Sequence, residues 1–127
     1  MPAARIDFNA GNLAQQIEAL SQDELDNLPF GVILLDRAGT VLFYSRTEAR
    51  QSGYNAIPIG RNLYEVAPCM QGPDFEGRVT RAMDEGDVDL EFGWPRDFAD
   101  PKRELRIRVQ SAASGGVWLF IERDDAR

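Results

Sequence analysis

The chain contains one cysteine, Cys69, and this lone thiol has the most distinctive chemistry in the sequence. Because it has no disulfide partner within the chain, any covalent chemistry must involve another molecule. The preceding Val66-Ala67 step is apolar, and Pro68 fixes the backbone φ angle just before the thiol. Free cysteines are usually buried and inert, so composition alone favours a structural role for Cys69. The surrounding residues must decide whether it is instead an attachment site.

The composition excludes most other kinds of active site. The 127 residues include no histidine, so Ser-His and Cys-His nucleophilic pairs, histidine-ligated haem and Cys/His zinc sites cannot form. A single cysteine rules out CxxC redox pairs, and neither a GxxxxGK[ST] nor a GxGxxG phosphate-binding motif is present. We therefore expect that the chain is not an enzyme. A thiol enzyme or redox sensor based on Cys69 stays an alternative, although no histidine base could activate the thiol.

Length and charge predict one globular, soluble domain. A chain of 127 residues is long enough for one hydrophobic core. The net charge of -7 argues against binding to nucleic acid or to an anionic membrane. The apolar run Val32–Leu35 stops at Asp36 and is too short to span a membrane, and Met1–Asn9 does not have the pattern of a signal peptide. A cytoplasmic location fits these features and the single cysteine.

Two short helices are predicted near the N-terminus. Apolar residues recur at helical spacing over Leu13–Leu20, and Ser21–Glu24 has the sequence of a capping box that opens a second helix. We expect these helices to form an N-terminal cap over residues 1–28, with Met1–Ala10 lying loosely on the domain. Residues 29–127 would then form the core of a single domain.

Two strands joined by a tight turn are the clearest elements of that core. The apolar run Phe30–Leu35 predicts a strand covered on both faces, and Val41–Tyr44 is its expected partner. Asp36–Gly39 lies between them as a turn, with a glycine where a positive φ is needed. Between residues 45 and 60 only short helical pieces are expected, because glycine, proline and hydroxyl residues interrupt this stretch.

A longer helix and three further strands are predicted in the second half. Pro73–Glu85 is typical of a helix, with acidic residues in its first turn and Gly86 at its end. Val88–Phe92 and Leu105–Val109 alternate as half-buried strands do. Val117–Ile121 is apolar on both faces and is expected in the centre of the sheet.

The order of elements predicts an α+β fold. We expect a five-stranded antiparallel sheet, with short helices and one connecting helix on one face and an N-terminal helical cap. Arg106 and Arg108 are expected on the solvated face of the fourth strand, because they alternate with its apolar residues. This order of strands and helices resembles that of PAS domains, a fold that hosts many functions.

Tyr44 and Glu48 are four residues apart, so a helical turn would point both side chains the same way. On spacing alone, the simpler interpretation is a buried tyrosine beside a solvated glutamate. Together with Val66-Ala67-Pro68-Cys69, however, this pair resembles the photoactive yellow protein family, and the similarity extends over residues 13–123. Further matching segments are Leu25–Gly31, Leu35-Asp36, Gly39, Gly60-Arg61-Asn62, Pro73, Phe75, Gly77 and Gly115–Arg123.

The resemblance implies a 4-hydroxycinnamoyl (p-coumaroyl) chromophore, derived from p-coumaric acid and held as a thioester on Cys69. In this family the phenolate oxygen of the chromophore is held by a tyrosine and a protonated glutamic acid, which correspond to Tyr44 and Glu48. The backbone amide of Cys69 would donate to the thioester carbonyl. The remaining chromophore-binding residues are expected to be Ser52, Tyr54, Pro68 and Phe98.

Electrostatics is consistent with these roles. A buried phenolate is costly unless it is hydrogen bonded, and Tyr44 and a neutral Glu48 could each donate a short bond to it. An apolar pocket raises the pKa of a carboxyl group, which would keep Glu48 protonated in the dark. Light would turn the chromophore double bond from trans to cis, and Glu48 would pass its proton to the phenolate. The new buried charge would then loosen the N-terminal helices.

The chain departs from the family pattern close to the expected chromophore. Tyr54 takes the place of an arginine that covers the ring, and Trp94 replaces a tyrosine. The spacing between Tyr44 and Cys69 is one residue shorter than the family implies. Near residues 100–101 a methionine associated with fast recovery is absent, so slow recovery in the dark is expected.

These features predict a blue-light photoreceptor. We expect it to bind a small-molecule chromophore and to act as a monomer or weak dimer. Because no effector domain is recognisable in the sequence, its signal should pass to a separate, unknown downstream protein. The main alternative is a PAS domain without a chromophore that serves as a signalling or dimerisation module.

Overall fold

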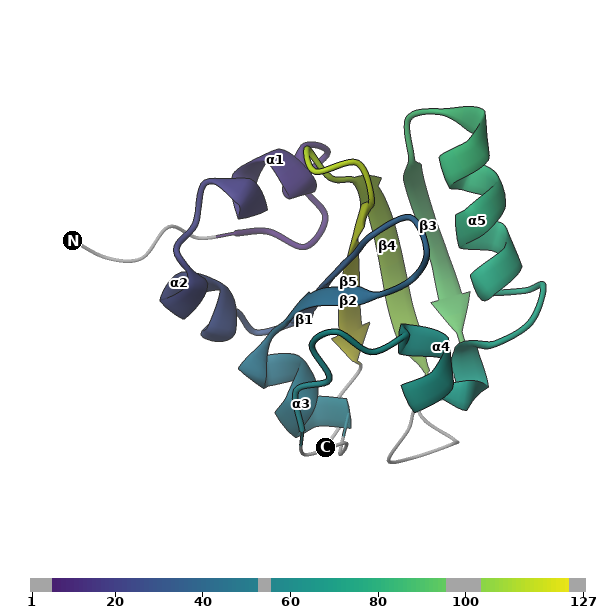
Figure 1. Ribbon diagram of the computed structural model, residues 1–127. Coiled ribbons are helices and arrows are strands. Elements are labelled where there is room, and N and C mark those ends of the chain that lie inside the picture. Colours follow the sequence, from purple (N-terminus) through teal and green to yellow (C-terminus); the bar gives the residue numbers. More distant parts are fainter. Residues whose placement is uncertain (1–5, 53–55, 96–103, 124–127) are drawn as a thin grey trace.

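The computed structural model describes residues 6–52, 56–95 and 104–123 (Figure 1). Its strands are β1 (Gly31–Leu35), β2 (Val41–Tyr44), β3 (Asp89–Trp94), β4 (Leu105–Ser111) and β5 (Val117–Arg123). Its helices are α1 (Leu13–Glu18), α2 (Gln22–Asp26), α3 (Arg46–Ser52), α4 (Leu63–Val66) and α5 (Glu76–Glu85), with a 3-10 turn η1 at Pro68–Met70. Within these described ranges, every helix is too short or too polar to cross a bilayer.

The strands form one antiparallel sheet in the order β2-β1-β5-β4-β3. β5 lies in the centre, as its apolar sequence predicted, and pairs with β1 from Gly31↔Ile121 to Leu35↔Val117. On its other side β5 pairs with β4, which in turn pairs with β3. The expected five-stranded antiparallel sheet is therefore confirmed, with β2 and β3 at its edges.

Hydrophobic residues cover both faces of this sheet. On one face, Leu119 of β5 belongs to the same core as Val79 of α5. On the other face, the neighbouring residue Phe120 packs in a second core with Leu13 and Ile17 of α1. Because successive residues of a strand point to opposite faces, β5 is buried on both sides. In Figure 1 the N-terminal helices and α5 accordingly lie on opposite sides of the sheet.

The N-terminal segment is held firmly against the sheet, which corrects two expectations. Arg108 is only 5% exposed rather than solvated, and its Nη1 donates to the carbonyl oxygens of Phe8 and Ala10, each at 2.7 Å. Phe8 is buried and packs edge-on against Phe30, with ring centroids 5.3 Å apart. Residues 6–10 therefore do not lie loosely on the domain. The alternation in β4 was predicted correctly, but the N-terminal segment covers the face that was expected to be solvated.

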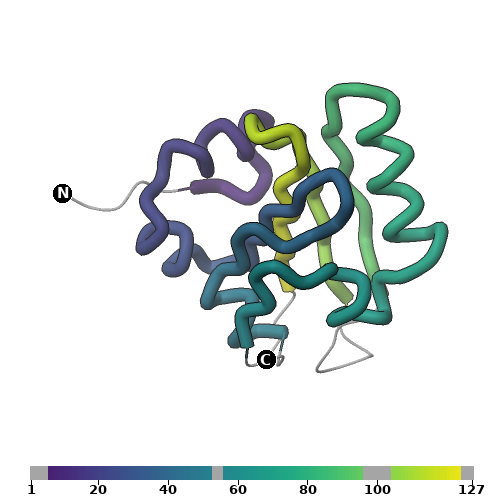
Figure 2. The backbone as a smooth tube through the Cα atoms, in the orientation of Figure 1, coloured from purple at the N-terminus to yellow at the C-terminus, as the bar shows by residue number. Residues whose placement is uncertain are grey.

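Further polar contacts attach α1 to the sheet. Glu18 Oε2 accepts hydrogen bonds from the Trp118 indole and the Ala113 backbone amide, each at 2.8 Å. Figure 2 shows the corresponding approach of the N-terminal segment to the turn before β5. Gln110 donates to the Gly11 carbonyl at 3.0 Å. Arg106, by contrast, is exposed as predicted, so the N-terminal segment covers only part of this face.

Local turn signals were mostly correct. Ser21 Oγ accepts from the Glu24 amide at 3.2 Å, and the Glu24 carboxylate accepts from the Ser21 amide at 2.8 Å, so the predicted capping box opens α2. Gly39 has a φ of 89°, which lets the chain reverse between β1 and β2. This reversal places the end of β2 beside β1, where α3 begins.

The connecting helix starts later than its sequence predicted. α5 begins at Glu76 rather than at Pro73, because the chain makes a turn over residues 73–75. Phe75 precedes the helix with φ -115° and ψ -69°, outside ideal helical geometry, and its ring is fully buried. Burial of this ring against the sheet therefore overrides the helix signal of the preceding residues. Gly86, with φ 121°, ends the helix as expected.

Replacing Arg108 with methionine should release the N-terminal segment, because the Phe8 and Ala10 carbonyls would lose a buried charged donor. We expect the free energy of unfolding to fall by about 1.5–3 kcal/mol, with faster amide exchange over residues 6–10. Urea unfolding and hydrogen exchange would measure both effects. Arg37→Met is the control, because that side chain is 58% exposed and its loss should cost no more than about 0.5 kcal/mol. Equal losses in the two variants would contradict the anchoring role of Arg108.

Candidate functional site

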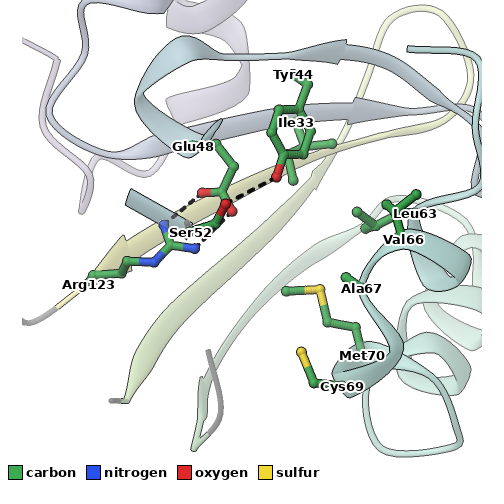
Figure 3. Close-up of a pocket in the computed structure, with 10 residues that line it drawn as sticks. All are labelled: Ile33, Tyr44, Glu48, Ser52, Leu63, Val66, Ala67, Cys69, Met70 and Arg123. Carbon is green, nitrogen blue, oxygen red and sulfur yellow. Dashed lines mark hydrogen bonds and ion pairs between the residues drawn. The ribbon is translucent and has the colours of Figure 1, made fainter. Parts of the chain in front are cut away.

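The side chains predicted to hold a phenolate come from β2 and α3. Tyr44 is the last residue of β2, Glu48 lies in the first turn of α3, and Ser52 ends that helix. Ser45 links β1 to α3, because its Oγ accepts hydrogen bonds from the backbone amides of Val32 and Glu48, each at 3.1 Å. This is the arrangement of an N-terminal helix cap, and it starts α3 directly after the strand. Tyr44, Glu48 and Ser52 are consequently brought together at one end of a pocket (Figure 3).

All three of these side chains are buried. Glu48 is 2% exposed, so the spacing-based interpretation of a solvated glutamate is wrong. Tyr44 and Ser52 are buried beside it, and their hydroxyl oxygens lie 3.5 Å apart. A buried carboxyl group next to a tyrosine hydroxyl can bind an oxygen atom of a guest molecule by donating hydrogen bonds to it when the carboxyl is protonated.

A glycine of β1 makes room for the carboxyl group. A Cβ atom at Gly31 would lie 1.9 Å from Glu48 Oε1 and 2.9 Å from its carboxyl carbon. No side chain larger than hydrogen therefore fits there while Glu48 keeps its position. Gly31, which matches the family pattern in the sequence, is thus the residue that this position requires in the present chain.

Arg123 is a member of this site that sequence reasoning missed. Its guanidinium makes two hydrogen bonds to the Glu48 carboxylate, from Nη1 to Oε1 at 2.7 Å and from Nη2 to Oε2 at 2.8 Å. Figure 3 shows this pair at the end of the pocket, and both side chains are 3% exposed by area. Two parallel charge-assisted bonds are the strongest form of this interaction, and they offset part of the cost of burying both charges. Glu48 is therefore held as part of an ion pair.

The sequence did contain a signal for Arg123. In β5 the side chains of Leu119, Ile121 and Arg123 point to the same face, because strand residues alternate with a period of two. Leu119 and Ile121 belong to the core that α3, α4 and α5 cover. An arginine in this series is directed toward the same covered face, and it needs an acidic partner there.

The other end of the pocket carries the thiol. Cys69 is a half-buried cysteine in the 3-10 turn η1, which Pro68 opens. The turn follows α4 directly, and Asn62 caps that helix by accepting from the Tyr64 amide at 2.9 Å. Gln71 then donates to the Tyr64 carbonyl at 2.6 Å and closes the loop behind the cysteine. Pro68 itself is exposed and is not among the residues that line the inner cavity, and its contact with a chromophore stays a prediction.

The pocket joins these two ends through an apolar wall. Cys69 and the buried polar group of α3 line the same small cavity, whose volume is about 20 Å³. Cys69 also borders a wider outer cleft of about 310 Å³. The thiol therefore lies between the outside and the interior. The residues that line the inner cavity are Ile33, Tyr44, Glu48, Ser52, Leu63, Val66, Ala67, Cys69, Met70 and Arg123.

Two predicted chromophore neighbours, Tyr54 and Phe98, lie outside the described residues. The aromatic residues Phe92 and Trp94 are described, and they form a cluster with the buried ring of Phe75. Trp94 also borders the outer cleft beside Cys69. These rings are thus mainly part of the core, as aromatic residues usually are.

Tyr64 is a second buried tyrosine near the attachment loop. Burial, followed by the negative charge of Glu76, raises the pKa of its hydroxyl well above the ordinary tyrosine range. Its ring packs edge-on against Phe75. Tyr64 therefore stays neutral and contributes to the core beneath the cysteine loop.

Comparison with known proteins agrees with this architecture. Residues 25–120 match a family model described as the PAS fold. The photoactive yellow protein domain of the sensor histidine kinase Ppr from Rhodospirillum centenum superposes with a TM-score of 0.72 and 36% identity, over 84% of this chain and 96% of that chain. A PAS domain of an HTR-like protein from Haloarcula marismortui gives a TM-score of 0.55 at 12% identity, over 87% of this chain and 99% of that one, and shows the fold alone. The chain is therefore a PAS-fold domain.

Relatives found by sequence identify the family within the PAS fold. The chain is 35% identical to the photoactive yellow protein of Cereibacter sphaeroides, over 93% of this chain and 97% of that protein. The photoactive yellow protein of Rhodothalassium salexigens is 27% identical over the same shares. The chain belongs to the photoactive yellow protein family. It is thus a PAS-fold photoreceptor rather than an enzyme, and neither the thiol-enzyme alternative nor the module without a chromophore is favoured.

Replacing Gly31 with alanine should displace the Glu48 carboxyl group, because the added methyl would overlap its oxygen. We expect a loss of about 1–3 kcal/mol in the free energy of unfolding, measured in urea. Gly11→Ala is the matched control, since among the described residues no atom outside its chain neighbours lies within 4 Å of a Cβ at that position. The loss at Gly31 should largely disappear in a Glu48→Ala background. A loss that is the same with and without the Glu48 side chain would show that the contact is not the cause.

Proposed function

We propose that the chain is a blue-light photoreceptor whose pigment is a p-coumaroyl group, held as a thioester by Cys69. The observation that carries this proposal is that Cys69 lines the same cavity as the Tyr44, Glu48 and Ser52 group. A thioester forms when the S–H bond of a thiol is replaced by a bond from Sγ to an activated acyl carbon. At the other end of the pigment, a phenolate oxygen needs buried donors, which the α3 group supplies.

When bound, the p-coumaroyl group would supply absorption of blue light, a double bond that isomerises from trans to cis, and a phenolate oxygen that accepts a proton. Tyr44 and a protonated Glu48 would each donate a hydrogen bond to that oxygen. The Cys69 backbone amide would donate to the thioester carbonyl. The apolar side chains of Ile33 and Leu63 would exclude water from the space between the two ends.

The polar and apolar residues of the lining suit this pigment. The cavity, however, is too small to hold it, so side chains of the lining must move when the pigment attaches. A cavity of about 20 Å³ holds roughly one water molecule. Met70 and Arg123 line it with long side chains that have several rotatable bonds. We infer that attachment at Cys69 moves lining side chains aside, so that the aromatic ring takes their place.

The contacts of α3 suggest a route for the signal. Thr47, next to Glu48, donates through Oγ1 to the carbonyls of Asp26 at 3.1 Å and Leu28 at 2.7 Å, at the end of α2. The Arg46 amide donates to Asp26 Oδ1 at 2.8 Å. Once Glu48 has given up its proton, a new charge lies buried on α3. Since a domain is stable by only about 5–15 kcal/mol, this charge can weaken the contacts of α3 with α2.

The cap that would loosen comprises residues 1–28. Its release would expose the apolar face of the sheet that α1 covers, where Phe120 and Trp118 lie. We propose that a separate downstream protein recognises this state, and that the return in the dark is slow.

Exposure of the purified chain to activated p-coumaric acid should turn it yellow and add the mass of one p-coumaroyl group. Cys69→Ser should stay colourless and keep its mass, because a serine hydroxyl is a far weaker nucleophile than a thiolate. Absorption spectroscopy and mass spectrometry of the intact protein would measure the two effects. An unaltered chain without colour or added mass would end the proposal, and so would equal labelling of the serine variant.

Glu48→Gln should keep the pigment but shift its absorption band, because glutamine can donate a hydrogen bond and cannot release a proton. The proton transfer after a blue flash should be lost, as followed by time-resolved absorption. Glu65→Gln is the control, since that carboxylate is exposed on α4 and lies outside the pocket lining. An unchanged spectrum and photocycle in the Glu48 variant would refute its role.

A further inference from the structure

The pocket contains a buried cation that the proposed function does not use. The Arg123 guanidinium forms two hydrogen bonds with the Glu48 carboxylate, at 2.7 and 2.8 Å, with both side chains 3% exposed. This geometry is that of an ionised carboxylate bound to a guanidinium. Donation to a phenolate, in contrast, requires a protonated Glu48. The same carboxyl group must therefore exist in two states with two different partners.

We propose that Arg123 is the positioning residue that receives the Glu48 carboxylate after its proton has left, and that it thereby sets how long the light-activated state lasts. The inference rests on the proposed function of the site. In the transfer, the O–H bond of Glu48 breaks and an O–H bond forms on the phenolic oxygen. The negative charge moves to Glu48, and no further reactant is needed. Glu48 then turns to Arg123, the partner to which the structure shows it bound.

The placement of the two residues suits this role. Arg123 lies at the end of the central strand β5, where it pairs in register with Leu105 of β4. Glu48 comes from α3, which is a short helix. The Arg123 cation thus lies on a strand that is hydrogen bonded within the sheet, whereas the Glu48 carboxylate lies on the short helix α3. A shift of the carboxyl group toward Arg123 would act on α3, whose neighbouring residue Thr47 holds the end of α2.

Arg123 should also control the stability of the deprotonated state. A buried carboxylate without a partner is strongly disfavoured, whereas one bound to two N–H groups is not. Removal of the guanidinium should therefore favour return of the proton to Glu48. Lysine at this position would restore the charge but not the two-pronged geometry, so its effect should be intermediate.

The first experiment compares the pigmented chain with Arg123→Met, Arg123→Lys and a control, Arg37→Met, which alters an exposed arginine between β1 and β2. After a blue flash we expect Arg123→Met to recover its colour about tenfold faster or more, since a hydrogen bond to a charged group is worth at least that factor. Arg123→Lys should lie between, and Arg37→Met should be unchanged. Infrared difference spectra should show the carboxylic C=O band, assigned with Glu48→Gln, bleaching less in Arg123→Met than in the unaltered chain.

The second experiment uses the chain without pigment and so does not depend on the photocycle. Urea unfolding of Arg123→Met, Glu48→Gln and the double variant forms a double-mutant cycle. We expect Arg123→Met to lower stability, and Glu48→Gln to restore much of that loss, because it removes the buried charge that has lost its guanidinium. This double variant also supplies a folded form if Arg123→Met alone is too unstable to study.

The outcomes separate the two proposals. A chain that takes up no pigment overturns the proposed function and this inference together. A chain that becomes yellow and bleaches in light, but whose Arg123→Met variant recovers within about twofold of the original rate or more slowly, overturns this inference alone. An additive double-mutant cycle would also overturn it, because the pair would then carry no coupling.

Discussion

A carboxyl group buried between a sheet and a short helix is the constraint on which this site depends. An ionisable group at 2% exposure must be neutral or paired, and its surroundings must leave it space. The structure meets each of these requirements with a different element. Gly31 of β1 provides the space, Arg123 of β5 provides the charge, and Ser45 anchors the helix that carries Glu48.

The same helix links the two layers that cover the sheet. α3 contacts the site through Glu48 and Ser52, and it holds the end of α2 through Thr47. α2 belongs to the N-terminal cap, which is fastened to the opposite face of the sheet by Arg108 of β4 and by Glu18. A change in charge at one site can thus reach the other face through contacts within a few residues of Glu48. The cap is thus attached to the sheet by buried polar contacts as well as by its apolar side chains.

The inner cavity is small, and an ion pair lies at its polar end. Glu48 and Arg123 satisfy each other while Met70 and the apolar wall close around them. Cys69 remains half-buried at the border between this interior and the outer cleft, where an acyl donor could reach it. The arrangement therefore combines a half-buried thiol with a paired polar group in one cavity.

Several features followed from residues that are close together in the chain. The capping box at Ser21, the turn at Gly39 and the central position of β5 were predictable because local hydrogen bonds and burial on both faces leave direct patterns. That Cys69 lines the same pocket as Tyr44 and Glu48 was expected only from the family resemblance. No spacing rule brings the end of a hairpin and a later turn into one pocket.

The tertiary structure alone decided what covers each face of the sheet. Alternation in β4 and β5 determined the sides to which Arg108 and Arg123 point, but not whether water or protein would lie there. The N-terminal segment covers Arg108, and α3 supplies the carboxylate for Arg123, in both cases from far away in the sequence. The physical reason is that alternation along a strand predicts only the face of the sheet to which each side chain points. Whether that side chain is buried, and which ionic partner it has, depends on the distant segment that packs against that face.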